Sequence, residues 1–446
     1  MESNGTRLQD QVASALSRRR VLQVLGAAAA VPLVSSMAAC GGNPGGSSGG
    51  DDTALRFLYL GDATQQKAFN KLFKSFEKSH PTITLKPTGL ASGTWAKFAS
   101  TVSTQIAGGK IPDSMQVATE GQALFASKDL LEPLDSYMKK DKKYVDDYYG
   151  AIDSNLKKWT DKFGSTDDHT YYMPGGYNPV VMYLNTDVFK KAGATIPDKD
   201  WTWDEFLDAG KKIKKKTGAY IMAAGYAFSF VDIMPWLLTN GASTLNDDWT
   251  KAVYNSPEAV EAAEFIRGIV EAKLSPKPGG EFDAADQMKK GKLATLGGGR
   301  WPTLDMRRLG IVDKVKIVNW PHKKRKGSPI GWDAWPMFKE SKNKDDVWKL
   351  IKYLMSTDAS KYFATVGGTN VPARDDVAHS QDFLKDAPEG SELLPEAVSF
   401  GTPIPSPPRG GEMDKPITEA WQKAILGHSS AKSALDKANE ELSKLL

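Results

Sequence analysis

The sequence predicts an α/β protein of two lobes, and two observations carry that prediction. Between residues 55 and 118, short apolar runs alternate with stretches of helical periodicity, in the order strand, helix, strand, helix, strand. This order is typical of a parallel sheet with crossover helices on its faces. The chain is also long: without its first 39 residues, 407 of 446 remain, which is more than one hydrophobic core usually holds.

Three strands are expected in the N-terminal part, at residues 55–60, 83–85 and 114–118. The helix after the first strand ends at Pro81, and its apolar residues recur at i, i+3, i+4 and i+7. These residues are Phe69, Leu72, Phe73 and Phe76. A second helix has Thr94 as its N-cap and stops at the glycine pair 108–109, so the alternation repeats at least twice.

The same alternation continues along the rest of the chain. Further strands are expected at residues 180–184, 293–296 and 315–318. Thr202 and Glu205 have the spacing of a capping box at the start of a helix. Residues 256–258 combine an N-cap serine, a proline at the first helical position and a first-turn glutamate. Helices are also expected at 345–363 and from 416 to the C-terminus.

The first 39 residues have the features of an export signal. Three arginines at 18–20 precede a short apolar segment, 21–34, which Pro32 interrupts and which is too short to cross a bilayer stably. The arginines resemble the twin-arginine signal, although a Sec-type signal is the alternative. The segment as a whole resembles a bacterial lipoprotein signal, because it ends at Cys40, the single cysteine of the chain.

A lone cysteine in an exported protein cannot form an intramolecular disulfide, so Cys40 needs another explanation. The lipoprotein resemblance implies that Cys40 is the first residue after cleavage and carries a diacylglyceryl group. The glycine- and serine-rich tract that follows is typical of a flexible tether, which we assign to residues 40–53. The expected location is therefore the outer face of a cell membrane, with lipid as the anchor.

The amino-acid composition indicates which classes of partner the chain is expected to bind. The formal net charge of +4 falls to +2 when residues 1–39, with four arginines and two acids, are removed. An excess this small does not favour nucleic acid as a partner. Aromatic usage is more informative, because several of the 12 tryptophans and 14 tyrosines lie next to glycine, proline or asparagine on expected turns. Such aromatics are well placed to line a cleft. Examples are found at residues 176–179, 299–302 and 331–336.

Six short segments, taken in their order and spacing, resemble the extracellular solute-binding proteins of ABC sugar importers. Maltose-binding protein belongs to the same family, and the resemblance covers nearly all of the chain after the tether. Most of the residues in these segments set turns and helix caps and are not expected to bind ligand. The segments are residues 76–85, 106–113, 130–135, 183–193, 201–206 and 367–374.

The resemblance implies a type II periplasmic-binding-protein fold, in which two α/β lobes are joined by a multi-strand hinge and a ligand cleft lies between them. Lobe 1 is expected to comprise residues 54–176 plus 321–370, and lobe 2 residues 177–320 plus 371–446. The chain is expected to cross between lobes near 176–180, 319–322 and 369–372. The family implies a monomer that captures a carbohydrate, closes, and docks on an ABC permease, without enzymatic activity, metal or cofactor.

The resemblance also assigns candidate ligand-binding residues to the loops at the mouth of the cleft. Carboxylates and amides would pair with sugar hydroxyls, and aromatic rings would cover the apolar face of a sugar ring. At position 178 maltose-binding protein has a glutamate, so the asparagine here keeps hydrogen bonding but loses charge. The candidates are Asp62, Glu120, Tyr177, Asn178, Phe230, Trp236, Arg300, Trp301, Trp332 and Asp333.

Two alternatives stay open on the sequence alone. A secreted glycoside hydrolase would use the same aromatic cleft and would need two carboxylates about 5–9.5 Å apart. No Gly-x-Ser-x-Gly segment lies between an expected strand and helix as a nucleophile elbow would, since the pattern occurs only in the glycine- and serine-rich tether. The five histidines lack the spacing of a metal site. The other alternative keeps the fold but replaces the sugar with a peptide, polyamine, phosphate ester or metal. The sequence does not identify which sugar is bound.

Overall fold

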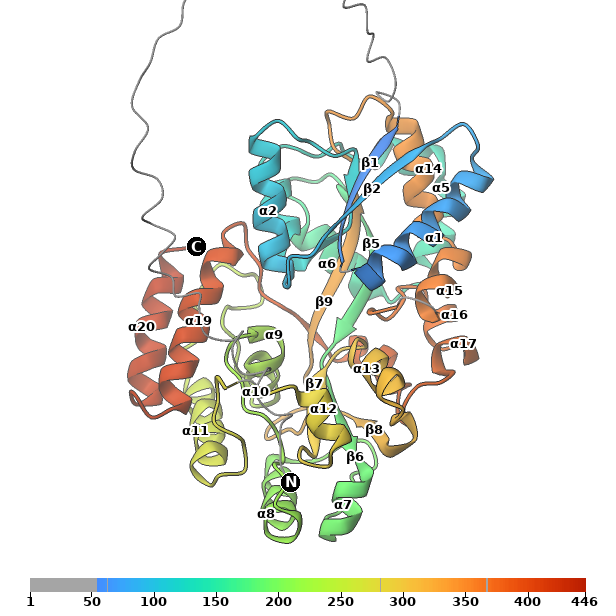
Figure 1. Cartoon of the computed structure of the whole chain (residues 1–446). Helices are drawn as coiled ribbons and strands as arrows, with labels where there is room; N and C mark the ends of the chain where they lie inside the picture. The colour runs from blue at the N-terminus through green and yellow to red at the C-terminus, as the bar shows by residue number, and fades with distance from the viewer. Residues whose placement is uncertain (1–53, 62, 281, 366–367) are drawn as a thin grey trace, which may run out of the picture. The chain divides into compact units, whose positions relative to one another are not determined.

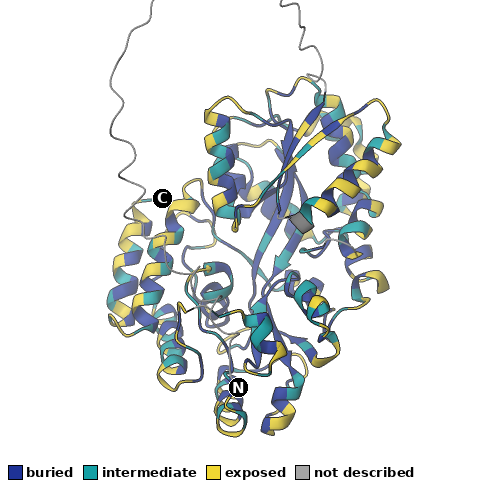
Figure 2. Cartoon of the chain, viewed as in Figure 1, coloured by how far each residue is buried: buried dark blue, intermediate teal, exposed yellow. Residues whose placement is uncertain are grey.

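The computed structural model describes residues 54–61, 63–280, 282–365 and 368–446. The export signal, Cys40, the tether and Asp62 lie outside the described residues. Within these residues the chain forms three small sheets, each flanked by helices (Figure 1). Buried residues follow the strands, and exposed ones cover the outer faces of the helices (Figure 2).

Lobe 1 begins with the parallel sheet that the sequence predicts. Strand β1 (Leu55–Leu60) lies between β2 (Leu85–Leu90) and β3 (Ser114–Met115), and both pairings are parallel. Helices α1 (Ala63–Ser79) and α2 (Trp95–Ala107) flank this sheet. The predicted apolar stripe of α1 is buried against β1, with the rings of Phe69 and Tyr59 stacked at 4.2 Å.

The expected strand at 114–118 is in fact two strands in different sheets. Strand β4 (Val117–Ala118) leaves the parallel sheet and pairs antiparallel with β9 (Pro329–Pro336). The remaining helices of this part of the chain pack around the two sheets. They are α3 (Thr119–Ala126), α4 (Asp135–Lys140), α5 (Lys142–Tyr149) and α6 (Ser154–Phe163).

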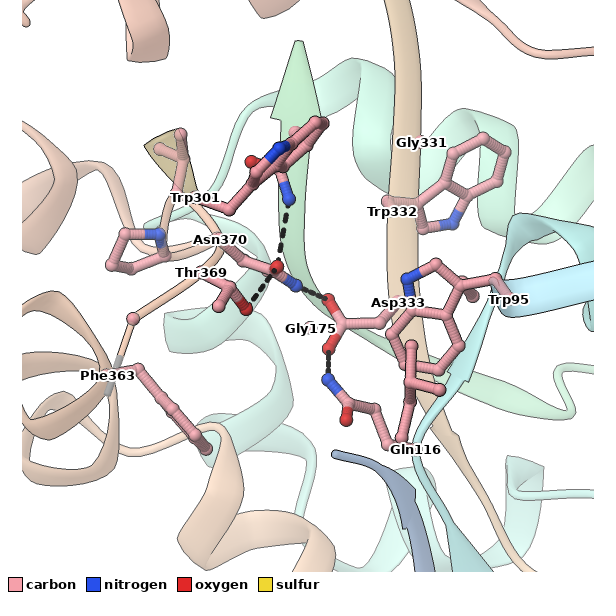
Figure 3. A pocket seen from close by; sticks show the side chains of 18 of the residues that line it. Trp95, Gln116, Gly175, Trp301, Gly331, Trp332, Asp333, Phe363, Thr369 and Asn370 are labelled. Atoms are coloured by element: carbon pink, nitrogen blue, oxygen red, sulfur yellow. Dashed lines mark hydrogen bonds between the residues drawn. The ribbon is translucent and has the colours of Figure 1, made fainter. Parts of the chain in front are cut away.

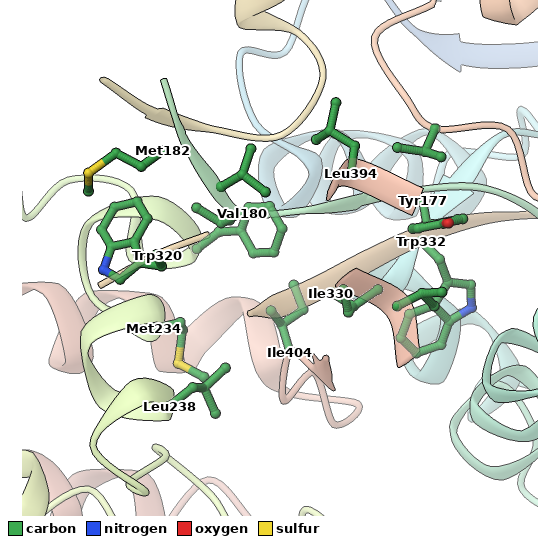
Figure 4. Packing of buried hydrophobic residues seen from close by; sticks show 14 of the residues in the cluster. Tyr177, Val180, Met182, Met234, Leu238, Trp320, Ile330, Trp332, Leu394 and Ile404 are labelled. Carbon is green, nitrogen blue, oxygen red and sulfur yellow. The ribbon is translucent and has the colours of Figure 1, made fainter. Parts of the chain in front are cut away.

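Two long strands join the lobes. Strand β5 (Tyr172–Pro179) runs antiparallel to β9 from the Tyr172–Pro336 pair to the Pro179–Ile330 pair. Val371 adds a third segment, because its backbone N–H and C=O both bond to those of Tyr177. The buried Ser328 hydroxyl accepts a hydrogen bond from the Val180 N–H at 2.8 Å and donates to the Val180 carbonyl. Buried apolar side chains, among them those of Tyr177, Val180 and Ile330, pack along this crossing (Figure 4).

Lobe 2 is built on a second three-stranded sheet, and this one is antiparallel. Strand β6 (Val181–Asn185) lies between β7 (Thr295–Gly298) and β8 (Val315–Val318). The predicted capping box at Thr202 and Glu205 forms at the start of α8. The predicted N-cap at Ser256 starts α11. The lobe 2 helices up to this point are α7 (Thr186–Ala192), α8 (Trp203–Thr217), α9 (Ser229–Asp232), α10 (Met234–Thr239), α11 (Pro257–Glu271), α12 (Ala284–Lys289) and α13 (Pro302–Leu309).

The C-terminal third differs from the sequence prediction in its helix boundaries. The single helix expected at 345–363 is two, α14 (Lys344–Leu354) and α15 (Thr357–Thr365). The long C-terminal helical region is also two, α19 (Gly410–Ile425) and α20 (Ala431–Ser443), and α19 begins before Pro416 and contains it. Four short elements lie between α15 and α19: α16 (Asp375–Ala378), α17 (Gln381–Leu384), α18 (Leu393–Glu396) and β10 (Thr402–Pro403).

Backbone hydrogen bonds link His322, Lys323 and Asp375 to segments outside the lobes expected for them. Within the segment 321–328, expected in lobe 1, His322 bonds to Trp201, and Lys323 bonds to Thr239 of α10. Asp375, expected in lobe 2, bonds instead to Ala151 in lobe 1. We therefore propose that the second crossing is β9 itself and that the third lies after α16.

Ser328 provides a test of the crossing. In a Ser328→Ala variant the buried Val180 N–H loses its partner, and leaving such a group unpaired costs about 1–3 kcal/mol. We expect the free energy of unfolding, measured by urea denaturation, to fall by this amount. The exposed Ser100→Ala in α2 serves as the control, with a change within about 0.5 kcal/mol. Equal effects in the two variants would show that the Ser328 bridge does not stabilise the crossing.

Candidate binding cleft

A cavity of about 360 Å³ lies beside the β5–β9 crossing, with residues of both lobes in its walls. Lobe 1 contributes the start of α2 and the segment from β4 into α3. Lobe 2 contributes the loop before α9 and the turn after β7. The crossing itself forms the floor, through residues 175, 176, 178, 331–333 and 368–373. Any molecule that fills the cavity would therefore contact both lobes and the segments that join them.

Aromatic rings form two facing walls. From lobe 2, Trp301, Phe228 and Phe230 make a cluster with ring centroids 5.9–6.4 Å apart. From lobe 1, Trp95 is the first residue of α2 and is half-buried, with its ring edge-on to Phe98 at 5.5 Å. Trp95 and Trp301 lie on opposite sides of the cavity (Figure 3). Flat apolar faces on both sides suit a ligand with apolar C–H surface.

A chain of side-chain amides runs along the floor and joins the lobes. The Arg300 backbone N–H donates to Asn178 Oδ1 at 2.9 Å, and Asn178 Nδ2 donates to Asn370 Oδ1 at 2.9 Å. Asn370 Nδ2 then donates to Asp333 Oδ1 at 3.1 Å, and Gln116 Nε2 donates to Asp333 Oδ2 (Figure 3). Every donor in the chain is directed toward the Asp333 carboxylate, so this group sets the orientation of the amides.

Asp333 is 3% exposed, and its burial raises its pKa to about 6. The hydrogen bonds from Gln116 and Asn370 act in the opposite direction and favour the ionised form. Gly176 lies alongside: a Cβ at this position would approach the Val371 carbonyl to 2.8 Å. A larger residue at 176 would separate the strands that hold the amide chain.

Glu120 presents a second carboxylate to the cavity, from the first turn of α3. Desolvation, with a smaller contribution from the charge of Asp414 on α19, raises the pKa of Glu120 to about 7. A hydrogen bond from its own backbone N–H favours the ionised form. This carboxylate therefore has a pKa close to neutral pH.

Arg300 does not line the cavity, although the sequence analysis placed it among the ligand-binding candidates. Its guanidinium is buried and donates to the carbonyls of Phe363, Ala364 and Asn370, the first two at the end of α15. Desolvation lowers its pKa to about 10. Since α15 contacts α1 of lobe 1 through Phe363 and Phe69, Arg300 holds the end of β7 against lobe 1.

Two further candidates lie in the core and not in the cavity. Tyr177 is fully buried, and its hydroxyl donates to the Pro395 carbonyl. Trp236 is also fully buried and packs against Trp203 and Trp320. Trp332 does line the cavity, but it is 1% exposed and its indole N–H donates to Thr160. The resemblance placed these residues on loops and turns, but Tyr177 lies within β5, Trp332 within β9 and Trp236 within α10.

The structure brings five of the candidates together in the cavity with side chains available to it: Glu120, Asn178, Phe230, Trp301 and Asp333. It adds residues that the sequence analysis did not select, namely Trp95, Gln116, Phe228, Phe363, Thr369 and Asn370. A signal was present for three of these. Trp95 follows a glycine and a threonine on a turn, as Trp301 follows a glycine and an arginine. Thr369 and Asn370 belong to the 367–374 segment that carried the family resemblance.

Comparison with known proteins identifies the family. A family model described as bacterial extracellular solute-binding protein matches residues 71–389. The chain belongs to this family. A binding protein of Brucella abortus (strain 2308) is 26% identical to this solute-binding protein over 401 residues, which cover 85% of this chain and 89% of the relative. The family resemblance seen in the sequence motifs is thus confirmed.

Solved structures share the fold. One is an ABC substrate-binding protein from Listeria monocytogenes in complex with cycloalternan, with a TM-score of 0.77 and 24% identity over 88% of this chain and 99% of that one. Another is an ABC transporter solute-binding protein from Thermotoga lettingae bound with α-D-tagatose, with a TM-score of 0.75 and the same identity and coverage. The expected two-lobe type II architecture is confirmed.

Within the described residues, no group of three or more His, Cys, Asp or Glu side chains is arranged to hold a metal ion. A search of the same residues finds no helix with the length and hydropathy of a membrane span.

The titration of Asp333 gives a pH-dependent prediction. Burial raises its pKa to about 6, from the ordinary value of 3.8 for an aspartate side chain. The folded state binds this proton more tightly, so the associated stability is complete below about pH 4 and is lost as the pH rises through about 6. We expect the stability of the wild type, relative to Asp333→Asn, to fall by about 2 kcal/mol between pH 4 and 7.

Urea denaturation of both proteins across this pH range measures the effect. Glu120 has a pKa raised in the same direction, and only the difference between wild type and variant isolates Asp333. The exposed Asp147→Asn on α5 is the matched control. A difference that does not change with pH would mean that Asp333 keeps its ordinary pKa.

Proposed function

We propose that this solute-binding protein captures a carbohydrate between its lobes and delivers it to an ABC permease. The observation that carries the proposal is the cavity itself: aromatic walls supplied by both lobes stand above a floor of amide and carboxylate groups. A sugar ring has an apolar face of C–H groups and a rim of hydroxyls. Aromatic rings cover the first, and amides and carboxylates pair with the second.

The structural relatives support this choice of ligand. The Listeria monocytogenes protein holds cycloalternan and the Thermotoga lettingae protein holds α-D-tagatose, and both ligands are carbohydrates. Below 25% identity such a likeness shows the fold alone, so the ligand class is carried here by the cavity lining. The cavity volume is at the small end of the usual range for ligand sites, which favours a ligand of one or two sugar rings.

Closure of the two lobes around a ligand follows because the residues that line the cavity are divided between the lobes. Trp95, Gln116 and Glu120 belong to lobe 1, whereas Phe230 and Trp301 belong to lobe 2. A ligand can contact both groups only when the lobes are together, so binding shifts the population toward the closed form. The closed form is the one that would dock on the permease.

A glycoside hydrolase is less well supported. Glu120 and Asp333 are the only carboxylates among the described residues that line the cavity. Both oxygens of Asp333 already accept hydrogen bonds from Asn370 and Gln116, which leaves this group poorly placed to attack or protonate a sugar. The family and the neighbours are binding proteins, and we propose that the ligand is bound without chemical change.

We also propose that the protein is a lipoprotein, exported by the twin-arginine route and held at the extracytoplasmic face of the membrane through Cys40, where it acts as a monomer. The family assignment supports the extracytoplasmic location. The arginine cluster, the short apolar segment and the cysteine before the glycine-rich tract support the anchor.

Removal of Trp301 tests the binding site. Trp301→Ala deletes one aromatic wall, and we expect the dissociation constant for the bound saccharide to rise at least about tenfold, which corresponds to about 1.4 kcal/mol. The measurement is a thermal-shift screen of residues 53–446 against mono- and oligosaccharides, followed by calorimetry on the strongest binder. Tyr220→Ala, a half-buried aromatic of lobe 2 outside the cavity lining, should leave the affinity unchanged. A screen in which no saccharide raises the melting temperature would disprove the carbohydrate proposal.

Replacement of Cys40 tests the anchor. In a full-length Cys40→Ser precursor no thiol remains to carry lipid, and we expect the protein to move from the membrane fraction to the soluble or secreted fraction. Phase partition in a cloud-point detergent measures this directly. A single-residue control, Ser47→Ala in the same tether, should stay with the membrane. A Cys40→Ser protein that remains in the detergent phase would rule out a lipid anchor at this residue.

A further inference from the structure

The charged side chains described in the lining of the cavity are all acidic. Among the described residues that line it, Glu120 and Asp333 carry the charged side chains, and none is lysine, arginine or histidine. The buried cation closest in the chain to the aromatic wall, Arg300, is absent from the lining, and its guanidinium is bonded to three backbone carbonyls. The cavity therefore presents negative charge without a built-in counter-charge.

The two carboxylates differ in how far the protein satisfies them. Asp333 accepts hydrogen bonds from Gln116 and Asn370 on its two oxygens, so its charge is spread into the amide chain. Glu120 has no such partner: within the described structure its carboxylate is bonded to its own backbone N–H and forms no ion pair. The Glu120 carboxylate can therefore still accept hydrogen bonds or an ion pair from a ligand.

A third acid strengthens the same effect from the opposite lobe. Asp414, on α19, is held by the Ser229 hydroxyl at 3.0 Å and forms no ion pair within the described residues. Helix α19 packs against α3, which carries Glu120, and the charge of Asp414 raises the pKa of Glu120. Two unpaired, partly desolvated carboxylates that repel each other are stabilised either by a proton or by a cation.

We propose that the ligand is a saccharide that carries a primary amine, with its ammonium group seated against Glu120, and that the cleft rejects anionic saccharides. This inference rests on the proposed carbohydrate function and specifies its substrate class. The aromatic walls and the floor amides accept the sugar ring, as they would for a neutral sugar. The ammonium adds charge-assisted hydrogen bonds to Glu120, which are about twice as strong as neutral ones.

The same geometry argues against anionic ligands. Proteins bind phosphate and carboxylate groups with arginine, lysine or free backbone N–H groups at a helix N-terminus. The cavity lining offers no basic side chain among its described residues. The starts of α2 and α3 both lie at the lining, and each already has a backbone N–H bonded to a side chain, to that of Thr94 in α2 and to that of Glu120 in α3. A negatively charged sugar would bring further negative charge to carboxylates that lack a partner.

Matched sets of sugars test the inference. Glucosamine, glucose and glucuronate form one set, the corresponding galactose derivatives a second, and the β-1,4-linked glucosamine disaccharide with cellobiose a third. Calorimetry on residues 53–446 at one pH and ionic strength gives the affinity of each. We expect the amine to bind at least about tenfold more tightly than its neutral counterpart in the set that fits, and the acid to bind most weakly.

A variant separates this charge effect from general binding. In Glu120→Gln, which is nearly isosteric, we expect the ratio of amine to neutral affinity to fall toward one. Asp414→Asn should lower the same ratio by a smaller factor, and the exposed Asp147→Asn should leave it at the wild-type value. A ratio that Glu120→Gln leaves unchanged would overturn the assignment to Glu120, even if the protein binds sugars.

The outcomes for the substrate class and for the function are distinguishable. Equal or tighter binding of a neutral or acidic member would overturn the amine proposal and leave the carbohydrate function intact. Binding of spermidine or putrescine, with no response to any saccharide, would overturn the carbohydrate function and with it the amino-sugar ligand.

Discussion

The structure depends on the antiparallel crossing of β5 and β9 between the lobes. Both strands lie in the core and carry the floor of the cavity between the lobes. Ser328 fixes one end of the crossing through both backbone groups of Val180. Because the lobes, the cleft and the hinge share these strands, ligand contact and lobe position cannot be independent of each other.

The amide chain is the set of side chains that links ligand contact to the position of the lobes. It begins at the backbone of Arg300 in lobe 2, passes through Asn178 and Asn370, and ends with Gln116 of lobe 1 at the Asp333 carboxylate. A buried carboxylate is costly unless it is hydrogen-bonded, and here it aligns amides from three separate segments. Asp333 thus orients the floor, whereas Glu120, which lacks such partners, is available to a ligand.

Local patterns in the sequence predicted much of the fold. The apolar stripe of α1, the capping box of α8 and the N-cap of α11 are confirmed, because each depends on residues within one or two helical turns. The division of 114–118 between two sheets, and of 345–363 into two helices, was not predicted. The first division depends on the pairing of β4 with the distant strand β9, to which a local pattern is insensitive. At the second, the Ser356 hydroxyl accepts a hydrogen bond from the Ala359 N–H at the start of α15.

The sequence by itself determined the family, several helix caps and apolar stripes, and a set of candidate cleft residues, because spacing and capping chemistry are local. Segments 176–179 and 331–336, expected as turns, are parts of strands β5 and β9. Only the tertiary structure decided which of those side chains face the cavity. Trp301 and Glu120 do, whereas Trp236 and Tyr177 are buried in the core and Arg300 binds backbone carbonyls. Side-chain direction at a turn depends on packing against segments a hundred or more residues away, and this packing is settled when the lobes fold together.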